Sequence, residues 1–178
     1  MTGTDSLHQL TRDGLLAVYA WADSEVLRHQ PRCEASGKCC HFKDHGHRLY
    51  ISHLEARHLL ETAPAWHFPS DETGCPFQVE GLCGQRETRP LACRVYFCDP
   101  TFSQPMEEIM EEGVNRLKKL VESLGLSWDY AQLHSFLNDP KRAGIEQIRH
   151  LAPTKESNQC NLESTASTSS RLSLPLVS

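Results

Sequence analysis

The sequence predicts a mainly α-helical protein in which helices flank an irregular, cysteine-rich loop region with minimal β structure. Three observations lead to this fold class. Apolar residues recur every three to four positions on either side of the middle of the chain, helix start and stop signals bound those stretches, and the middle has few long apolar runs but many cysteines. We expect a single domain over residues 1–152, part of whose fold rests on something other than hydrophobic burial.

The first predicted helix covers residues 5–29. Its apolar residues fall on one face at helical spacing, and Pro31 follows as a stop signal. The residues that mark this face are Leu7, Leu10, Val18, Trp21 and Ala22.

Two short elements are predicted next. Residues 48–51 favour a short strand. Ser52 and Glu55 form a capping-box pattern, in which each side chain bonds the backbone of the other residue. A helix is therefore expected to start there, to run to about Ala63 and to end at Pro64.

A hairpin and a short helix follow. Residues 77–83 have the pattern of a small hairpin with Glu80-Gly81 at its turn. Pro90 suits the start of a helix because its fixed backbone angle is already helical. That short helix would carry Cys93 and Arg94.

The strongest helix signal in the chain lies at residues 105–124. Acidic residues occupy its first turn and Lys118 and Lys119 lie near its end, as the helix dipole favours, and Gly125 suits the position just past the end. We interpret its apolar stripe as facing the core. The stripe consists of Met106, Ile109, Met110, Val114, Leu117, Leu120, Val121 and Leu124.

Two further helices are expected before the composition changes. One starts at Ser127 and runs to about Asn138, and a short one covers residues 141–150. From residue 153 onward Ser and Thr dominate and periodicity is lost, so residues 153–178 are predicted to be a disordered tail. Cys160 lies inside it and is interpreted as a stray thiol.

Composition excludes several classes of partner and places the chain in the cytoplasm. The net charge is −5 and no stripe of Lys and Arg is present, so we expect no nucleic-acid partner. Residues 1–5 lack a signal-peptide pattern, and no apolar run approaches the roughly 20 residues that span a bilayer, so no membrane partner is expected. In the cytoplasm thiols stay reduced, which favours metal binding or catalysis over disulfides.

The cysteines are the most informative feature of the sequence. Of eight in the chain, seven lie between residues 33 and 98, and most of the ten histidines share that region. Glycine and proline surround them and allow tight loops around an ion. The seven candidate metal ligands are Cys33, Cys39, Cys40, Cys75, Cys83, Cys93 and Cys98.

Thiolates of this number suit zinc or iron, including a 4Fe–4S cluster. Three arrangements remain open: two tetrahedral ions that share a bridging sulfur, two separate sites completed by one histidine, or one four-cysteine cluster with three thiols left for a second site. In an extended segment neighbouring side chains point in opposite directions, so we expect either that Cys39 and Cys40 serve two different metals or that one binds and the other does not. His41 is the first candidate for an eighth ligand because it follows this pair, and Arg94 is a candidate to offset thiolate charge and donate to sulfur.

The ordered motifs resemble a known bacterial family. Cys33 and Gly37-x-Cys39-Cys40 are followed by Cys75-Pro76-Phe77, Cys83 and Arg89-Pro90-x-x-Cys93-Arg94-x-Tyr96-x-Cys98. This order is similar to that of the YkgJ family, also called CxxCxxCC or zinc- or iron-chelating domain proteins. The resemblance covers residues 33–98 and implies metal chelation without a settled reaction. Ser36 stands where the family name implies a cysteine, so the number of metals is left open.

Three functional hypotheses follow. The first is a small cytoplasmic metal-binding protein that chelates zinc, iron or an iron–sulfur cluster. The second is an iron–sulfur-dependent redox or group-transfer enzyme, or an accessory subunit of one, with an open coordination position at Ser36. The third is a zinc-stapled interaction module, whose protein partner the sequence does not identify. No catalytic residue is assigned.

Overall fold

The computed structural model describes residues 3–146 and 150–151, and it is mainly helical, which confirms the predicted class at that level. The elements in chain order are α1 (Gly3–His29), η1 (Lys38–Cys40), β1 (Tyr50–Ser52), α2 (His53–Thr62), β2 (Trp66–His67), β3 (Gln78–Val79), β4 (Leu82–Cys83), α3 (Leu91–Val95), η2 (Pro100–Phe102), α4 (Ser103–Ser123), β5 (Tyr130–Gln132), α5 (Leu133–Asn138), η3 (Pro140–Ala143) and β6 (His150–Leu151).

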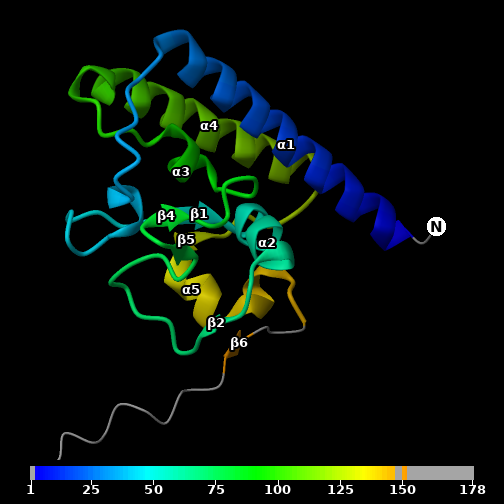
Figure 1. The fold of residues 1–178 in the computed structure, drawn as a ribbon. Coiled ribbons are helices and arrows are strands. Elements are labelled where there is room, and N and C mark those ends of the chain that lie inside the picture. Colours follow the sequence, from blue (N-terminus) through cyan, green and yellow to red (C-terminus); the bar gives the residue numbers. More distant parts are fainter. Residues whose placement is uncertain (1–2, 147–149, 152–178) are drawn as a thin grey trace, which may run out of the picture.

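The two long helices α1 and α4 lie side by side and run in opposite directions (Figure 1). Contacts along the pair fix this orientation. Leu120 packs where Gly14 has no side chain, and the Arg116 guanidinium lies 4.2 Å from the Trp21 ring centre. At the other end of α1, the rings of His29 and Phe102 are 5.7 Å apart. The core of this layer consists of Leu15, Val18, Tyr19, Ala22, Val26, Leu91, Val95, Phe102, Ile109 and Leu117.

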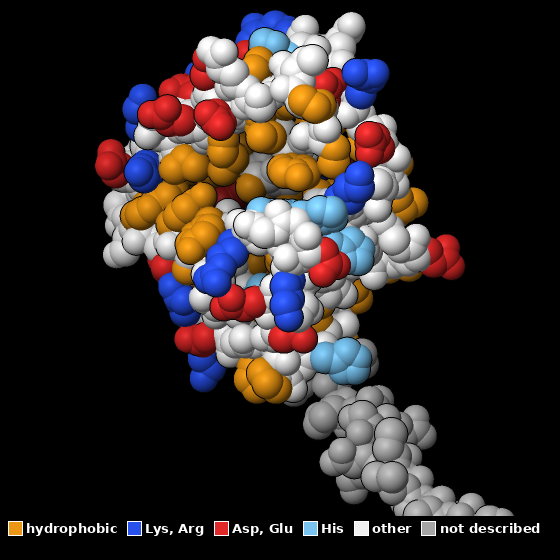
Figure 2. Space-filling view, turned by 90° about the vertical axis from the view of Figure 1, so that its left-hand side faces the viewer, with side chains coloured by type: hydrophobic (Ala, Val, Ile, Leu, Met, Phe, Trp, Pro, Cys, Tyr) orange, Lys and Arg blue, Asp and Glu red, His pale blue; other side chains and the backbone are white. Residues whose placement is uncertain are grey.

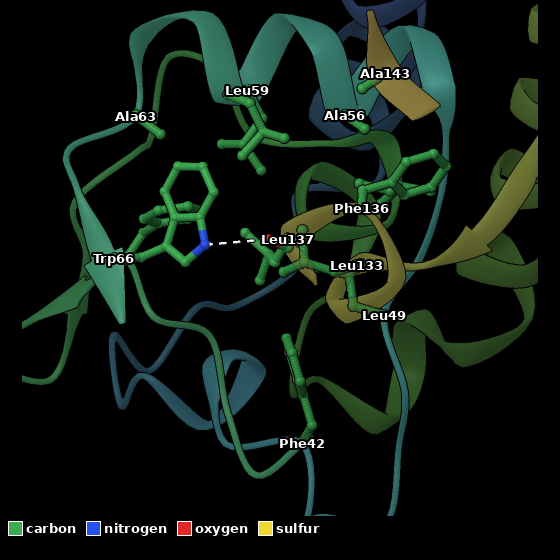
Figure 3. Close-up of a cluster of buried hydrophobic side chains, with 13 residues drawn as sticks. Phe42, Leu49, Ala56, Leu59, Ala63, Trp66, Leu133, Phe136, Leu137 and Ala143 are labelled. Atoms are coloured by element: carbon green, nitrogen blue, oxygen red, sulfur yellow. Dashed lines mark hydrogen bonds between the residues drawn. The ribbon is translucent and has the colours of Figure 1, made fainter. Parts of the chain in front are cut away.

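A second core lies between α2, α5 and the short strands (Figure 3). α2 begins at the predicted capping box: the Ser52 hydroxyl accepts from the Glu55 amide, and the Glu55 carboxylate accepts from the Ser52 amide. The apolar face of α2 then packs on α5. The buried members of this core are Phe42, Leu49, Ile51, Ala56, Leu59, Leu60, Ala63, Trp66, Phe77, Leu133, Phe136, Leu137 and Ala143.

α3 joins the two cores, although it is only five residues long. Leu91 and Val95 are buried in the α1–α4 core, while Ala92 and Cys93 pack against the second core. The Leu91 amide donates to the Glu55 carboxylate at 2.7 Å, and Glu55 is itself 1 % exposed. A buried carboxylate thus ties α3 to the start of α2.

Three small two-stranded sheets complete the described structure. The predicted hairpin is present, with β3 antiparallel to β4 and both Glu80 and Gly81 at positive φ, as its tight turn requires. β1 pairs antiparallel with β5, and β2 pairs parallel with β6. The last two pairings join segments far apart in the sequence.

The chain after α4 differs from prediction. A helix was expected from Ser127 to Asn138, but residues 130–132 form β5 and only α5 is helical. β5 forms because its backbone pairs with β1, a long-range partner that outweighs local helix preference. The helix predicted over residues 141–150 is also wrong: it is replaced by η3 and, further on, β6. The tail predicted at residues 153–178, with Cys160, lies outside the described residues.

Tyr130 provides a test of this packing at high pH. Its ring stacks between Trp128 and Tyr50, and burial raises its pKa to about 12. An unfolded tyrosine ionises near pH ~10, so the stabilising contribution is complete below that pH and is lost as the pH rises to about 12. We expect the free energy of unfolding to fall across this window while the phenolate absorbance rises. A Tyr130→Phe variant should lose less stability than the unmodified chain between pH 10 and 12. If the two show the same pH dependence of the free energy of unfolding, the raised pKa of Tyr130 is contradicted.

Within the described residues, no helix combines the length and the apolar character needed to cross a bilayer.

Candidate metal centre

The seven predicted cysteines come together around one cavity, which we call the cysteine cavity. Its volume is about 140 Å³, and four separate stretches of chain supply its walls. All seven thiols are free; Cys40 is buried and Cys33 is exposed. The lining includes Cys33, Cys39, Cys40, Cys75, Cys83, Cys93 and Cys98, together with Arg86, Arg89, Tyr96 and Phe97.

Backbone contacts hold the first two cysteine segments against each other. The Cys75 amide donates to the Cys40 carbonyl at 2.8 Å. The Gln78 side chain donates to the carbonyls of Gly37 and Gly81, which docks the β3–β4 hairpin onto η1. Gly37 has a φ of 68°, and any side chain there would run into the Gly81 carbonyl, so this docking requires glycine. Cys83, at the end of β4, is delivered to the cavity by the same hairpin.

The expectation that Cys39 and Cys40 lie on an extended segment is wrong. Both belong to the 3₁₀ turn η1, in which successive side chains are about 120° apart rather than opposite. Both can therefore line one cavity, as they do. Sequence reasoning missed this because the glycines around the cysteines indicated tight loops in general, not a 3₁₀ turn directly after Gly37.

Asp99 joins the two outermost cysteine segments. Its carboxylate accepts from the Arg32 amide at 3.0 Å and from the amide and hydroxyl of Thr101 at 3.0 and 2.7 Å. These hydrogen bonds lower the pKa of Asp99 to about 2. Since Cys33 follows Arg32 and Cys98 precedes Asp99, the contact brings both thiols to the same edge of the cavity.

The Cys40 thiol is the common neighbour of three others. Its hydrogen bonding with Cys39, Cys75 and Cys83 raises the pKa of Cys40, and the same contacts lower the pKa of each partner. The pKa values of Cys39 and Cys83 fall to about 6. A proton held on Cys40 thus favours thiolates on Cys39 and Cys83 near neutral pH.

Cys93 lies behind this group. Burial, followed by the charges of Cys75, Cys39 and Cys83, raises its pKa well above the usual value. Although the thiols share a cavity, no three His, Cys, Asp or Glu side chains in the described part of the chain are already spaced as closely as a bound metal ion requires. The thiol contacts are therefore looser than metal–sulfur coordination.

The positive charge of Arg89 influences three of the thiols. It lowers the pKa values of Cys39 and Cys83, and it partly opposes the rise in the pKa of Cys93. The charge of Arg86 also lowers the pKa of Cys83. Sequence reasoning missed Arg89 as a charge partner, although it stands four residues before Cys93. Its place next to Pro90, at the start of α3, was the available signal.

Arg94, the predicted donor to sulfur, makes different contacts. Its Nε and Nη2 donate to the carbonyls of Arg89 and Glu87, and Nη1 pairs with Asp23 at 2.8 Å. Its guanidinium carbon lies 4.2 Å from the centre of the buried Tyr19 ring. Arg94 therefore links α1 to the loop before α3, and it is Arg89 that lines the cavity.

The histidines stand at the edge of the site. His41, the candidate eighth ligand, is exposed, is 3.6 Å from Asp44 and is absent from the cavity lining. His47 lies nearer: its Nε2 is 3.3 Å from the Cys39 carbonyl, and its ring stacks on Tyr96. The structure thus brings the seven cysteines together and leaves His41 outside.

Comparison with protein-family models, with curated proteins and with solved structures finds no match to this chain.

Proposed function

We propose that the chain binds a transition metal, as zinc or as an iron–sulfur cluster, through Cys39, Cys40, Cys75 and Cys83. A single observation carries this proposal: within the cysteine cavity, the Cys40 thiol lies close enough to the other three thiols for each of them to shift its pKa. These cysteines come from η1, from the loop before the hairpin and from the hairpin itself. Four sulfur donors are the complement of a tetrahedral zinc site or of one iron–sulfur cluster.

The chemistry of the donors fits such a group. Metals bind thiolates rather than thiols, and three of the four groups already have a lowered pKa. Arg86 and Arg89 would offset the negative charge of an all-thiolate site. When bound, the metal would cross-link segments that otherwise meet through a few backbone hydrogen bonds, so its binding energy would stabilise the fold.

Cys33, Cys93 and Cys98 are not members of this four-thiol group. The charges of Cys75, Cys39 and Cys83 act on Cys93, and Cys33 is exposed at the rim. We propose one metal site, with these three thiols around it. The resemblance to the YkgJ family supports the same assignment, and we propose membership of that family on its ordered motifs.

Metal analysis of the protein purified without oxygen tests the proposal. We expect about one zinc per chain, or about four irons with as many sulfides and a visible absorption band. Cys39→Ser, Cys75→Ser and Cys83→Ser should each lose most of the metal and unfold at a lower temperature. Added chelator should lower the melting temperature of the unmodified chain towards that of the variants, since ligand binding stabilises the folded state.

Two matched serine variants serve as controls. Cys160→Ser, at a position that the structure does not describe, and Cys33→Ser, at the exposed rim, should retain the metal content of the unmodified chain. Full metal content in all three ligand variants would refute the four-thiol site. Loss of half the metal in Cys33→Ser would replace it with a two-metal site. Iron with sulfide would direct further work to redox or group-transfer chemistry, and zinc to a structural role.

A further inference from the structure

A second cavity lies beside the cysteine cavity and is used by nothing proposed so far. Its volume is about 640 Å³, and we call it the aromatic cavity. Hydrophobic side chains gather around a hollow on this side of the molecule, with acidic side chains grouped beside it (Figure 2). It is lined by Arg48, Tyr50, Ala92, Val95, Tyr96, Met106, Glu107, Met110, Glu111, Val114, Asn115, Lys118 and Tyr130.

One wall of this cavity is aromatic. The rings of Trp128 and Tyr130 stack 5.6 Å apart and within 13° of parallel, and Tyr50 continues the stack at 6.0 Å. Tyr50 ends the stack and is 41 % exposed, so one face of its ring is open to the cavity. Tyr96, backed by the stacked ring of His47, forms a second aromatic surface.

The opposite wall is the surface of α4. Met106, Met110 and Val114 are four residues apart and therefore lie in one row along the helix. These residues belong to the stripe that the sequence analysis assigned to the core. Ile109, Leu117 and Val121 are buried as expected, whereas this row is only partly buried: it packs against the edge of the α1–α4 core and also lines the cavity. Methionine side chains are flexible and polarisable and adapt to ligands of varied shape.

The acidic side chains at the rim of the aromatic cavity lack partners within the described ranges, whereas the basic side chains have them. Glu107 and Glu111 have no ion pair or hydrogen bond with any side chain among the residues that the structure describes. The basic groups are engaged: Arg48 is 3.7 Å from Glu72, and the Lys118 ammonium is 5.9 Å from the Trp128 ring centre. A bound molecule would therefore meet two free carboxylates and the electron-rich faces of tyrosines.

We propose that the aromatic cavity binds a small organic cation with a flat apolar body. The ring faces attract a cationic group, and the free carboxylates of Glu107 and Glu111 add to that attraction. The apolar body would lie between the Tyr50 ring and the row of methionines. The volume falls within the range of small-molecule sites. This inference does not depend on metal in the cysteine cavity.

Three probes that share a naphthylmethyl body and differ in the charge of the head group test the charge preference on the full-length protein as purified. They are 2-naphthylmethyl-trimethylammonium, the neutral 2-naphthalenemethanol and the anionic 2-naphthylacetate, with binding measured by isothermal titration calorimetry. The cation should bind about tenfold more tightly than the alcohol, and the anion most weakly. Added salt should reduce the difference in affinity between the cation and the alcohol.

Paired variants on one helix locate the site. Glu107→Gln with Glu111→Gln should weaken binding of the cation by about fivefold and leave the alcohol unchanged. The control, Glu108→Gln with Glu112→Gln, removes two charges at the same spacing on α4 but outside the cavity lining, and should have little effect. Tyr50→Leu should also weaken the cation while keeping an apolar wall.

The proposal is overturned if the cation binds no more tightly than the alcohol, or if the two glutamine pairs weaken it equally. These substitutions replace polar surface residues or the exposed Tyr50, and circular dichroism of each variant checks that α4 is intact. Metal content is measured on the same samples, so that a failure of the metal proposal is seen separately.

Discussion

Replacement of Trp66 by alanine is expected to lower the free energy of unfolding by about 3–5 kcal/mol. The side chain is 2 % exposed, and its ring meets that of Phe77 edge-on at a centre distance of 5.9 Å. Its Nε1–H donates to the Leu137 carbonyl at 3.3 Å, across the second core (Figure 3). Alanine would leave a cavity and an unpaired buried carbonyl.

Urea unfolding followed by circular dichroism measures this loss. Trp66→Phe, which keeps a ring but not the hydrogen bond, should fall between the alanine variant and the unmodified chain. Leu27→Ala is the surface control, since Leu27 is 71 % exposed, and should change stability by less than about 0.5 kcal/mol. Equal losses for Trp66→Ala and Leu27→Ala would contradict the packing described. Because Phe77 lies two residues from Cys75, we also expect weaker metal retention in Trp66→Ala.

Replacement of Glu55 by alanine should have a comparable effect, about 3 kcal/mol, for a different reason. One carboxylate oxygen accepts from the Leu91 amide at 2.7 Å, and the other accepts from the amide and hydroxyl of Ser52, each at 2.8 Å. The side chain is fully buried, and burial raises the pKa of Glu55. Its removal would leave buried amides at Leu91 and Ser52 without partners.

Hydrogen exchange separates the contribution of the Glu55–Leu91 contact from that of the Glu55–Ser52 contacts. Glu55→Ala should expose the amides of residues 91–95 to exchange as well as lowering stability, because α3 loses its anchor. Ser52→Ala removes only the hydroxyl contacts at the helix start, should cost about 1 kcal/mol, and should leave exchange in α3 nearly unchanged. If exchange in α3 is the same in both variants, Glu55 does not anchor that helix.

The elements that the sequence predicted correctly are those with a strong local signal. The capping box at Ser52, the turn at Glu80-Gly81 and the glycine after α4 each specify a backbone conformation within a few residues. β5 carries no such signal, because three residues are too few to show an alternating pattern. Its structure depends on β1, about 80 residues earlier in the chain.

The candidate site shows the same division. The number of cysteines and their surroundings make them candidate ligands, but which of their thiols lie together could not be predicted. That grouping depends on the local turn at η1 and on the docking of the hairpin against Gly37, which is a contact between distant segments. Arg89 and Arg94 both lie near Cys93 in the sequence. Sequence distance alone does not indicate which of the two side chains faces the thiols, and only Arg94 was predicted to do so.

The dual attachment of α3 connects the two cavities. Cys93 lines the cysteine cavity, while Ala92 and Val95, on the same short helix, line the aromatic cavity. A rigid helix of five residues cannot shift one face without shifting the other. If α3 moves when either cavity fills, the two binding events are thermodynamically linked, and each changes the affinity of the other by the same factor. Metal binding in the cysteine cavity would then change ligand affinity in the aromatic cavity, which the metal does not contact.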